Sequence, residues 1–362
     1  MKNFMQAAKN LQEDPESGLP EIHRSTFQSV FDYLYRLRSA QGIISFDVEN
    51  IEHLFGIAEM EMESGERDPL VFRRNLITLI LQTLERAIRQ DLPRDFPIVI
   101  SEPSSYQRRV NTTYAEMFAG LSTRRWLSGE YGTLSNGVCR DTIITMNYDC
   151  LLDDALLKIG VTPDYGLAGA SYPKEVTRSV RGQLLKLHGS ANWFYCTNDS
   201  CRRRLQVWSG GPAERLDYGG RPCRSCSSSV EPIIVPPTWA KGSRREMLAP
   251  VWAQALHALV EAGQIFVIGY SMPETDAFFK YMLASALAKN RAIDRVVVVN
   301  PDPDVIEHYA QLFQRPFRDR RFSPIRHTAA SYVWYDLGNH LGQFEVGLDR
   351  HAVEASGFKI SP

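Results

Sequence analysis

The sequence predicts an α/β fold with a doubly wound, mostly parallel sheet, a helical N-terminal region and a small cysteine-rich module. Three observations support this prediction. Four short, nearly continuous apolar runs are typical of strands that are buried on both faces of a sheet. Helical patterns lie between these runs. Polar residues or glycine follow each run directly.

The four predicted strands lie in the second half of the chain and are rich in β-branched residues. They are DTIITM before Asn147, QLLKL before His188, QIFVIGY ending at Tyr270 and DRVVVVN ending at Asn300. The helical patterns between them are CLLDDALLKI, PVWAQALHALVEA and TDAFFKYMLASALAKN. Strands that alternate with helices indicate a Rossmann-like sheet.

The domain organisation follows from the change of pattern along the chain. We expect a helical region at 1–130, packed on the sheet, a core at 131–315 that contains the module at 193–230, and an extension at 316–362. Apolar residues recur at helical spacing in the first region. They are Phe27, Val30, Phe31, Leu34 and Leu37, and then Val71, Leu76, Ile77, Leu79, Ile80 and Leu84. FPIVISEPSS, with Pro97 and Pro103, breaks the pattern before a further helix from Tyr106 to Leu127.

Composition and charge exclude several classes of protein. With 362 residues, 44% of them hydrophobic and 23% charged, the chain is typical of globular proteins. The net charge of -1 favours neither nucleic acid nor an anionic membrane as partner. The sequence contains no apolar run long enough to span a bilayer and no signal peptide, so we expect a cytoplasmic protein. Six cysteines in so long a chain do not form a secreted disulfide framework.

Polar and small residues follow all four predicted strands, where open α/β sheets bind their ligands. These residues are Asn147 and Asp149, then His188, Gly189 and Ser190, then Gly269 and Ser271, and finally Asn300. Amide and carboxylate groups suit sugar hydroxyls, and small residues with free N–H groups suit phosphate. The sequence therefore predicts a site for a ribose- and phosphate-containing ligand.

A structural role is the alternative for each of these residues. Asn147 and Asp149 could cap the helix that begins near Leu151, although capping and ligand contact are compatible. His188 could be a structural histidine, but its place between a buried strand and Gly-Ser favours a functional one. Ser271 and Asn300 could simply begin loops.

The spacing of four cysteines predicts a zinc module. Cys196 and Cys201 form a Cys-x4-Cys pair, and Cys223 and Cys226 form a Cys-x2-Cys pair beyond a glycine-containing loop. Four thiolates leave no open position on the metal, which makes the zinc structural. Free thiols or a disulfide are the alternative. Cys139 and Cys150, which flank the first predicted strand, are expected to be small buried apolar residues.

The order of these motifs resembles that of sirtuins of the bacterial type. The matching stretches are TMNYDCLL, KLHGSANWFYC, the two cysteine pairs, VIGYSMPETD and VVNPDP, and EPIIVPPTWAK resembles a proline-rich segment of bacterial relatives. The resemblance covers about residues 140–305. It implies that His188 is the general base on a ribose hydroxyl and that Asn147 and Asp149 hold the nicotinamide ribose or a water. It also implies that Ser271 and Asn300 contact the phosphates and the adenosine ribose.

The sequence departs from sirtuins at its start. Sirtuins begin with a strand and a Gly-Ala-Gly-x-Ser loop around the pyrophosphate, and no such loop occurs here. Gly18-Leu19-Pro20 resembles the end of that loop, and Met1-Lys2-Asn3-Phe4 resembles the helix after it. We therefore expect that the chain starts late and lacks one strand and the main phosphate cradle. NAD affinity would then be poor, and the apolar flank of the neighbouring strand would be exposed.

The resemblance implies three functions that involve NAD or ADP-ribose. The first is an NAD glycohydrolase that cleaves the nicotinamide–ribose bond, as bacterial relatives do in antiphage defence. The second is a protein-lysine deacylase, and the third is a non-catalytic module that senses NAD or ADP-ribose, alone, as a homo-oligomer or with a partner protein. A nucleic-acid-binding ribbon is a rival from another class, because Arg202, Arg203 and Arg204 lie beside Trp193 and Trp208. The near-neutral charge disfavours that rival.

Overall fold

The computed structural model describes residues 4–40, 50–64, 69–90, 138–158, 161–167, 170, 180–208, 222–235, 243–329 and 332. The predicted helix from Tyr106 to Leu127, the break at FPIVISEPSS and the side chain of Cys139 lie outside this part of the chain. No helix within it combines the length and the apolarity needed to cross a membrane.

The N-terminal region is helical, as the apolar spacing predicts. It consists of α1 (Phe4–Glu13), the short η1 (Pro15–Ser17), α2 (Glu21–Ala40), α3 (Ile51–Ser64) and α4 (Pro69–Gln90). The apolar stripes of α2 and α4 are buried against each other and against α1 and α3. The residues at the centre of these stripes are Phe27, Val30, Leu76 and Leu79, each fully buried.

All four predicted strands are present, and they belong to two parallel sheets of three strands each. The first sheet has the order β1 (Val138–Thr145), β3 (Val180–Lys186), β2 (Val161–Asp164). The second has the order β7 (Gln264–Ile268), β8 (Arg295–Val299), β9 (Phe322–Ile325). Strand β9 and all but the first residue of the preceding α12 (Arg315–Arg321) come from the expected C-terminal extension.

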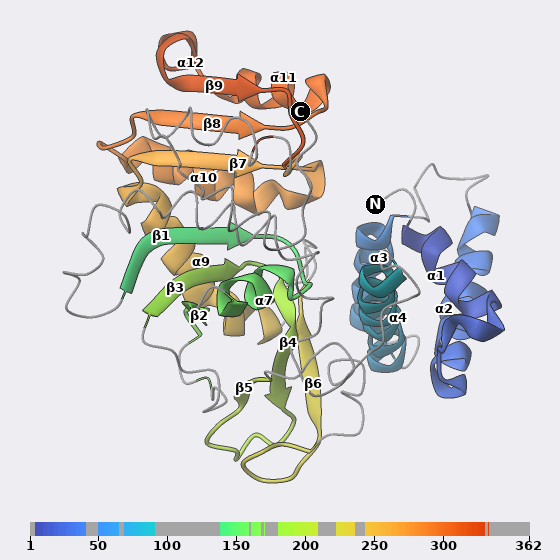
Figure 1. Cartoon of the computed structure of the whole chain (residues 1–362). Helices are drawn as coiled ribbons and strands as arrows, with labels where there is room; N and C mark the ends of the chain where they lie inside the picture. Colours follow the sequence, from blue (N-terminus) through green and yellow to red (C-terminus); the bar gives the residue numbers. More distant parts are fainter. Residues whose placement is uncertain are drawn as a thin grey trace, which may run out of the picture.

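Strands β1 and β7 are the facing edges of the two sheets (Figure 1). Within the described ranges each of them pairs with one strand only. Their apolar side chains are half-buried, for example Ile143 and Ile144 in β1 and Val267 in β7. The inner strands β3 and β8 have buried apolar side chains instead, for example Leu184 and Val298.

The helices between the strands join the two sheets through one hydrophobic core. They are α7 (Leu151–Lys158), α9 (Ser243–Glu261), α10 (Ala277–Lys289) and α11 (Pro303–Leu312), and the short η4 (Glu274–Asp276) precedes α10. Leu184 of β3 and Val298 of β8 belong to the same apolar cluster as Val251 and Ala255 of α9. Apolar residues of both sheets and of these helices therefore form one continuous core.

A third, antiparallel sheet carries the cysteine module. Its order is β5 (Leu205–Val207), β4 (Gly189–Cys196), β6 (Val230–Ile234), and β4 continues the chain directly after His188. Helix α4 is joined to β6, because Arg73 donates a hydrogen bond to the carbonyl oxygen of Ile234 at 2.7 Å. Apolar residues of α1–α4 and of the module form one buried cluster. The helical region and the module are thus packed together (Figure 1).

Candidate functional site

Asn147 and His188 lie on adjacent segments at the carboxyl ends of β1 and β3. Thr145 is paired with Lys186 in the parallel register, and the N–H of Leu187 donates to the carbonyl oxygen of Thr145 at 3.0 Å. Two residues after this pair, one segment reaches Asn147, which is exposed, and the other reaches His188, which is only 5% exposed. The sequence-based expectation that the ends of these two strands meet at one edge agrees with this register.

The imidazole of His188 is held on several sides. Its Nδ1 lies 2.9 Å from the carbonyl oxygen of Val235, and because a carbonyl only accepts, Nδ1 carries the hydrogen. The rings of Tyr148 and Trp252 contact it edge-on, with centroid distances of 6.3 and 6.2 Å. The indole N–H of Trp252 donates to the carbonyl oxygen of Leu187 at 2.9 Å, which fixes that ring. The tautomer and the orientation of the histidine are therefore set by the fold.

The other ring nitrogen of His188 faces a carboxylate that the sequence reasoning did not single out. Nε2 lies 3.0 Å from Oδ1 of Asp276, and both side chains are almost fully buried. The hydroxyl of Tyr270 donates to Oδ2 of the same carboxylate at 2.6 Å. The only signal in the sequence was the place of Asp276 at the end of VIGYSMPETD, just before α10.

The electrostatics of Tyr270 link the helical region to this site. Burial, the carboxylate of Asp276 and the hydrogen bond to it raise the pKa of Tyr270 well above its usual value of 10.0. Tyr309 and Glu52 add to the shift in the same direction. Glu52 is a buried residue in the first turn of α3. The carboxylate of Glu52 in α3 is therefore close enough to Tyr270 for its charge to act on the phenol.

Two predicted site residues have the geometry of caps and turns. Oδ1 of Asp149 accepts a hydrogen bond from the N–H of Leu151 at 3.0 Å, at the start of α7. Oδ1 of Asn300 accepts from the N–H of Asp302 at 3.0 Å. These are the local hydrogen bonds that Asx residues typically make before helices. These hydrogen bonds use the Oδ1 atom of each side chain. They are compatible with a contact between a ligand and the other side-chain atoms.

The predicted small residues divide into two groups. Gly189 has φ +87°, and a Cβ there would lie 2.0 Å from the carbonyl oxygen of Ile233, so the close passage of β4 and β6 requires glycine. Ser190 is completely buried. By contrast, Gly269 has φ +70° but open space within 4 Å of the position that a Cβ would take, and Ser271 is exposed. The loop after β7 is therefore more accessible to a ligand than the segment after β3.

A buried polar network lies next to the site, and the sequence analysis did not predict it. Nζ of Lys186 lies 2.9 Å from Oδ2 of Asp153, with side-chain exposures of 1% and 2%. The same Nζ donates to the carbonyl oxygen of Asp149. The hydroxyl of Tyr165 donates to Oδ1 of Asp153 at 2.5 Å. The lysine in the middle of the apolar run QLLKL was the signal in the sequence.

The charge state of this network follows from its partners. Burial by itself would lower the pKa of Lys186, but Asp153 first of all, then Cys150 and Asp149, outweigh it and raise that pKa. Burial and the adjacent Asp153 raise the pKa of Tyr165 well above 10.0. At neutral pH the network is therefore an ammonium–carboxylate pair with a neutral phenol, and it ties the loop after β1 to β3.

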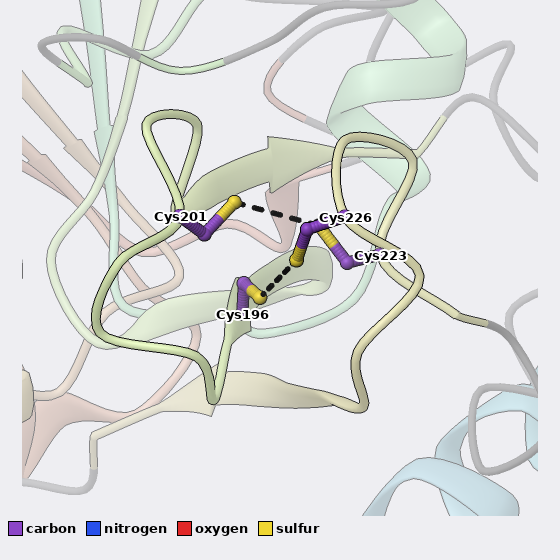
Figure 2. Close-up of side chains that lie close together, drawn as sticks. All are labelled: Cys196, Cys201, Cys223 and Cys226. Atoms are coloured by element: carbon purple, nitrogen blue, oxygen red, sulfur yellow. Dashed lines mark hydrogen bonds between the residues drawn. The ribbon is translucent and has the colours of Figure 1, made fainter.

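The four predicted cysteines lie together, as expected from their spacing (Figure 2). Their sulfur atoms are all within 4.8 Å of one another. Sγ of Cys196 is 3.4 Å from Sγ of Cys226, and Sγ of Cys201 is 3.8 Å from Sγ of Cys223. Tetrahedral zinc with bonds of about 2.3 Å separates its sulfur ligands by about 3.8 Å, whereas a disulfide requires about 2.05 Å. The cluster is consistent with a zinc site.

Hydrogen bonds at the cluster favour thiolates. The backbone N–H groups of Asn198 and Ser225 each donate to the sulfur of the cysteine two residues earlier, at 3.4 Å. Hydrogen bonds from Ser228 lower the pKa of Cys226 to about 6, whereas burial raises the pKa of Cys196 to about 12. Cysteine binds metal as the thiolate, so a cation at this position would reverse the effect of burial.

The arginines of the module are partly engaged within the protein. Nη2 of Arg204 lies 2.9 Å from the carboxylate of Asp199. Arg202 and Arg203 are exposed, while the indole of Trp208 is buried and stacked on Phe194 with a centroid distance of 4.0 Å. Trp193 is also fully buried. Neither tryptophan therefore offers an exposed ring for stacking on a nucleic-acid base.

Comparison with known proteins adds no assignment. No protein-family model matches the sequence, and no curated protein matches it. The chemistry of the site is therefore interpreted from its own residues.

Proposed function

We propose that this protein is an NAD glycohydrolase that cleaves the nicotinamide–ribose bond with His188 as general base. The observation that supports the proposal is the pairing of the β1 and β3 ends, which brings the segment that contains Asn147 next to that of a buried histidine whose Nδ1 carries the hydrogen. In this proposal the two parallel sheets act as the halves of one doubly wound sheet. The dinucleotide lies across their carboxyl ends, as ligands of open α/β sheets do.

The fixed tautomer decides which nitrogen reacts. Because Nδ1 of His188 donates to the carbonyl oxygen of Val235, Nε2 has the lone pair that can take a proton. That proton comes from a ribose hydroxyl or from the water that attacks the oxocarbenium-like carbon. Asn147 and Asp149 hold the nicotinamide ribose or this water. Gly269, Ser271 and Asn300 contact the phosphates and the second ribose.

The experiment measures nicotinamide release from NAD, with and without an acetylated peptide. Release without peptide supports the hydrolase, whereas release only with peptide indicates a deacylase and no release indicates a binding module. His188→Ala is expected to lower kcat by about 10²- to 10⁴-fold, the usual contribution of a general base. His257→Ala is the matched control, because that histidine lies on the exposed face of α9 with 71% side-chain exposure. Equal activity of both variants would refute the assignment of His188.

We further propose that Cys196, Cys201, Cys223 and Cys226 bind one structural zinc ion. Four thiolates fill a tetrahedral shell, so the zinc when bound would stabilise the fold and would not activate water. Metal analysis of the purified protein is expected to give about one zinc per chain, as one four-ligand site requires. Cys223→Ser is expected to lose the metal, and Cys150→Ser, which changes a buried cysteine outside the cluster, is expected to retain it. Full zinc content in Cys223→Ser would contradict this site.

A further inference from the structure

Asp276 and His188 contact each other inside the protein although they follow strands of different sheets. His188 follows β3, whereas Asp276 ends the short η4 after β7. Nε2 and Oδ1 are 3.0 Å apart, and the two side chains are 6% and 5% exposed. Within the described part of the chain, neither atom has an aligned hydrogen-bond partner. These two atoms therefore face each other in the interior of the protein.

The interaction between the two atoms depends on whether Nε2 carries a hydrogen. Nδ1 of His188 already carries a hydrogen, because it faces the carbonyl oxygen of Val235. An unprotonated Nε2 would present a lone pair to a carboxylate that also only accepts. Such a buried contact is repulsive without a proton and strongly attractive with one.

The carboxylate is held in place by the loop that carries it. Tyr270 donates to Oδ2 at 2.6 Å, and the hydroxyl of Tyr309 in turn donates to the carbonyl oxygen of Tyr270 at 3.2 Å. Between Tyr270 and Asp276 the buried Met272 has φ +51°, a conformation that costs free energy in a residue with a side chain. The fold therefore retains an unfavourable backbone geometry in the loop that positions Asp276.

We propose that Asp276 is a positioning residue that acts through His188 in the hydrolysis of NAD. When His188 takes the proton of a ribose hydroxyl, the O–H bond breaks, an Nε2–H bond forms and the imidazole becomes a cation. The carboxylate of Asp276 stabilises this cation, and Tyr270 keeps the carboxylate in place. This inference rests on the proposed function, because it assigns the partner of the same general base.

The kinetic test compares Asp276→Asn with the wild-type chain. Asparagine keeps the shape and removes the charge, so kcat is expected to fall by about 10- to 100-fold, the usual effect of losing a charged hydrogen-bond partner. The KM for NAD is expected to stay within about twofold, because Asp276 acts through His188 and not on the substrate. Tyr270→Phe is expected to give a smaller loss of kcat in the same direction. The matched control is Asp319→Asn, whose side chain is 62% exposed. A wild-type kcat in Asp276→Asn, or a raised KM with unchanged kcat, would overturn the inference.

A spectroscopic test separates this inference from the proposed function. The imidazole nitrogens of His188 are observed by NMR in the protein without NAD and are assigned with His188→Gln. Asp276→Asn is expected to move the Nε2 resonance and to leave the Nδ1 resonance in place, because Val235 still accepts from Nδ1. An unchanged Nε2 resonance would refute the contact. If the wild-type chain releases no nicotinamide but Nε2 responds, the proposed function fails and the pair stands.

Discussion

Replacing Asp153 with alanine tests how strongly a buried ion pair holds α7 against the end of β3. Asp153 accepts from Nζ of Lys186 at 2.9 Å and from the hydroxyl of Tyr165 at 2.5 Å. Lys186 is 1% exposed, so water cannot replace the lost carboxylate. The variant leaves a buried ammonium group that still donates to the carbonyl oxygen of Asp149 but has lost its counter-charge.

The expected loss of stability follows from the burial of the pair. Breaking a buried pair by removing one partner costs about 3–5 kcal/mol, because a buried charge remains uncompensated. The hydroxyl of Tyr165 also loses its partner, at about 1–3 kcal/mol, but the two effects share one carboxylate and are not additive. We therefore expect a loss of about 3–5 kcal/mol in the free energy of unfolding, a large fraction of the usual 5–15 kcal/mol.

Urea unfolding monitored by circular dichroism measures this loss. Glu13→Ala is the matched control, because its partner Lys9 is 3.8 Å away and both side chains are more than half exposed. Such a surface pair contributes less than about 1 kcal/mol. The double variant Asp153→Ala/Lys186→Met is expected to recover about half or more of the loss, because it removes the uncompensated charge. A loss below about 1 kcal/mol in Asp153→Ala, or no recovery in the double variant, would refute the reasoning.

Three further predictions concern the backbone, alkaline pH and metal removal. Gly189→Ala is expected to yield little folded protein, because residue 189 has φ +87° and its Cβ would lie 2.0 Å from a carbonyl oxygen of β6. The control Gly263→Ala has open space around the new Cβ and should show a normal thermal melt. The pKa values of Lys186 and Tyr165 are raised in the folded chain, so the folded state binds more protons and stability should fall above about pH 10, by up to about 1.4 kcal/mol per pH unit for each group. Unfolding midpoints that stay constant from about pH 9 to 12 would contradict this. Removal of zinc by a chelator should lower the melting temperature in proportion to the metal lost; a melting temperature that does not change on full removal would argue against a structural zinc.

Local patterns in the sequence were sufficient for the long elements. The apolar spacing in α2 and α4 and the four apolar runs of β1, β3, β7 and β8 each encode a conformation through neighbouring residues. The short strands β2, β5 and β9, of three or four residues, carry too little periodicity to be recognised. Strand β4 was not predicted for another reason. It follows β3 after only two residues, where the chain turns from the parallel sheet into the antiparallel one.

The sequence by itself determined which side chains follow each strand and that four cysteines are spaced for one metal ion, because both properties depend on residues close together in the chain. Only the tertiary structure decided that the strands belong to two parallel sheets and that Asp276 contacts His188. It also decided that glycine is needed at position 189, where β4 passes close to β6. These are contacts between distant segments. They depend on how helices and sheets pack against one another, and no local pattern of residues specifies that packing.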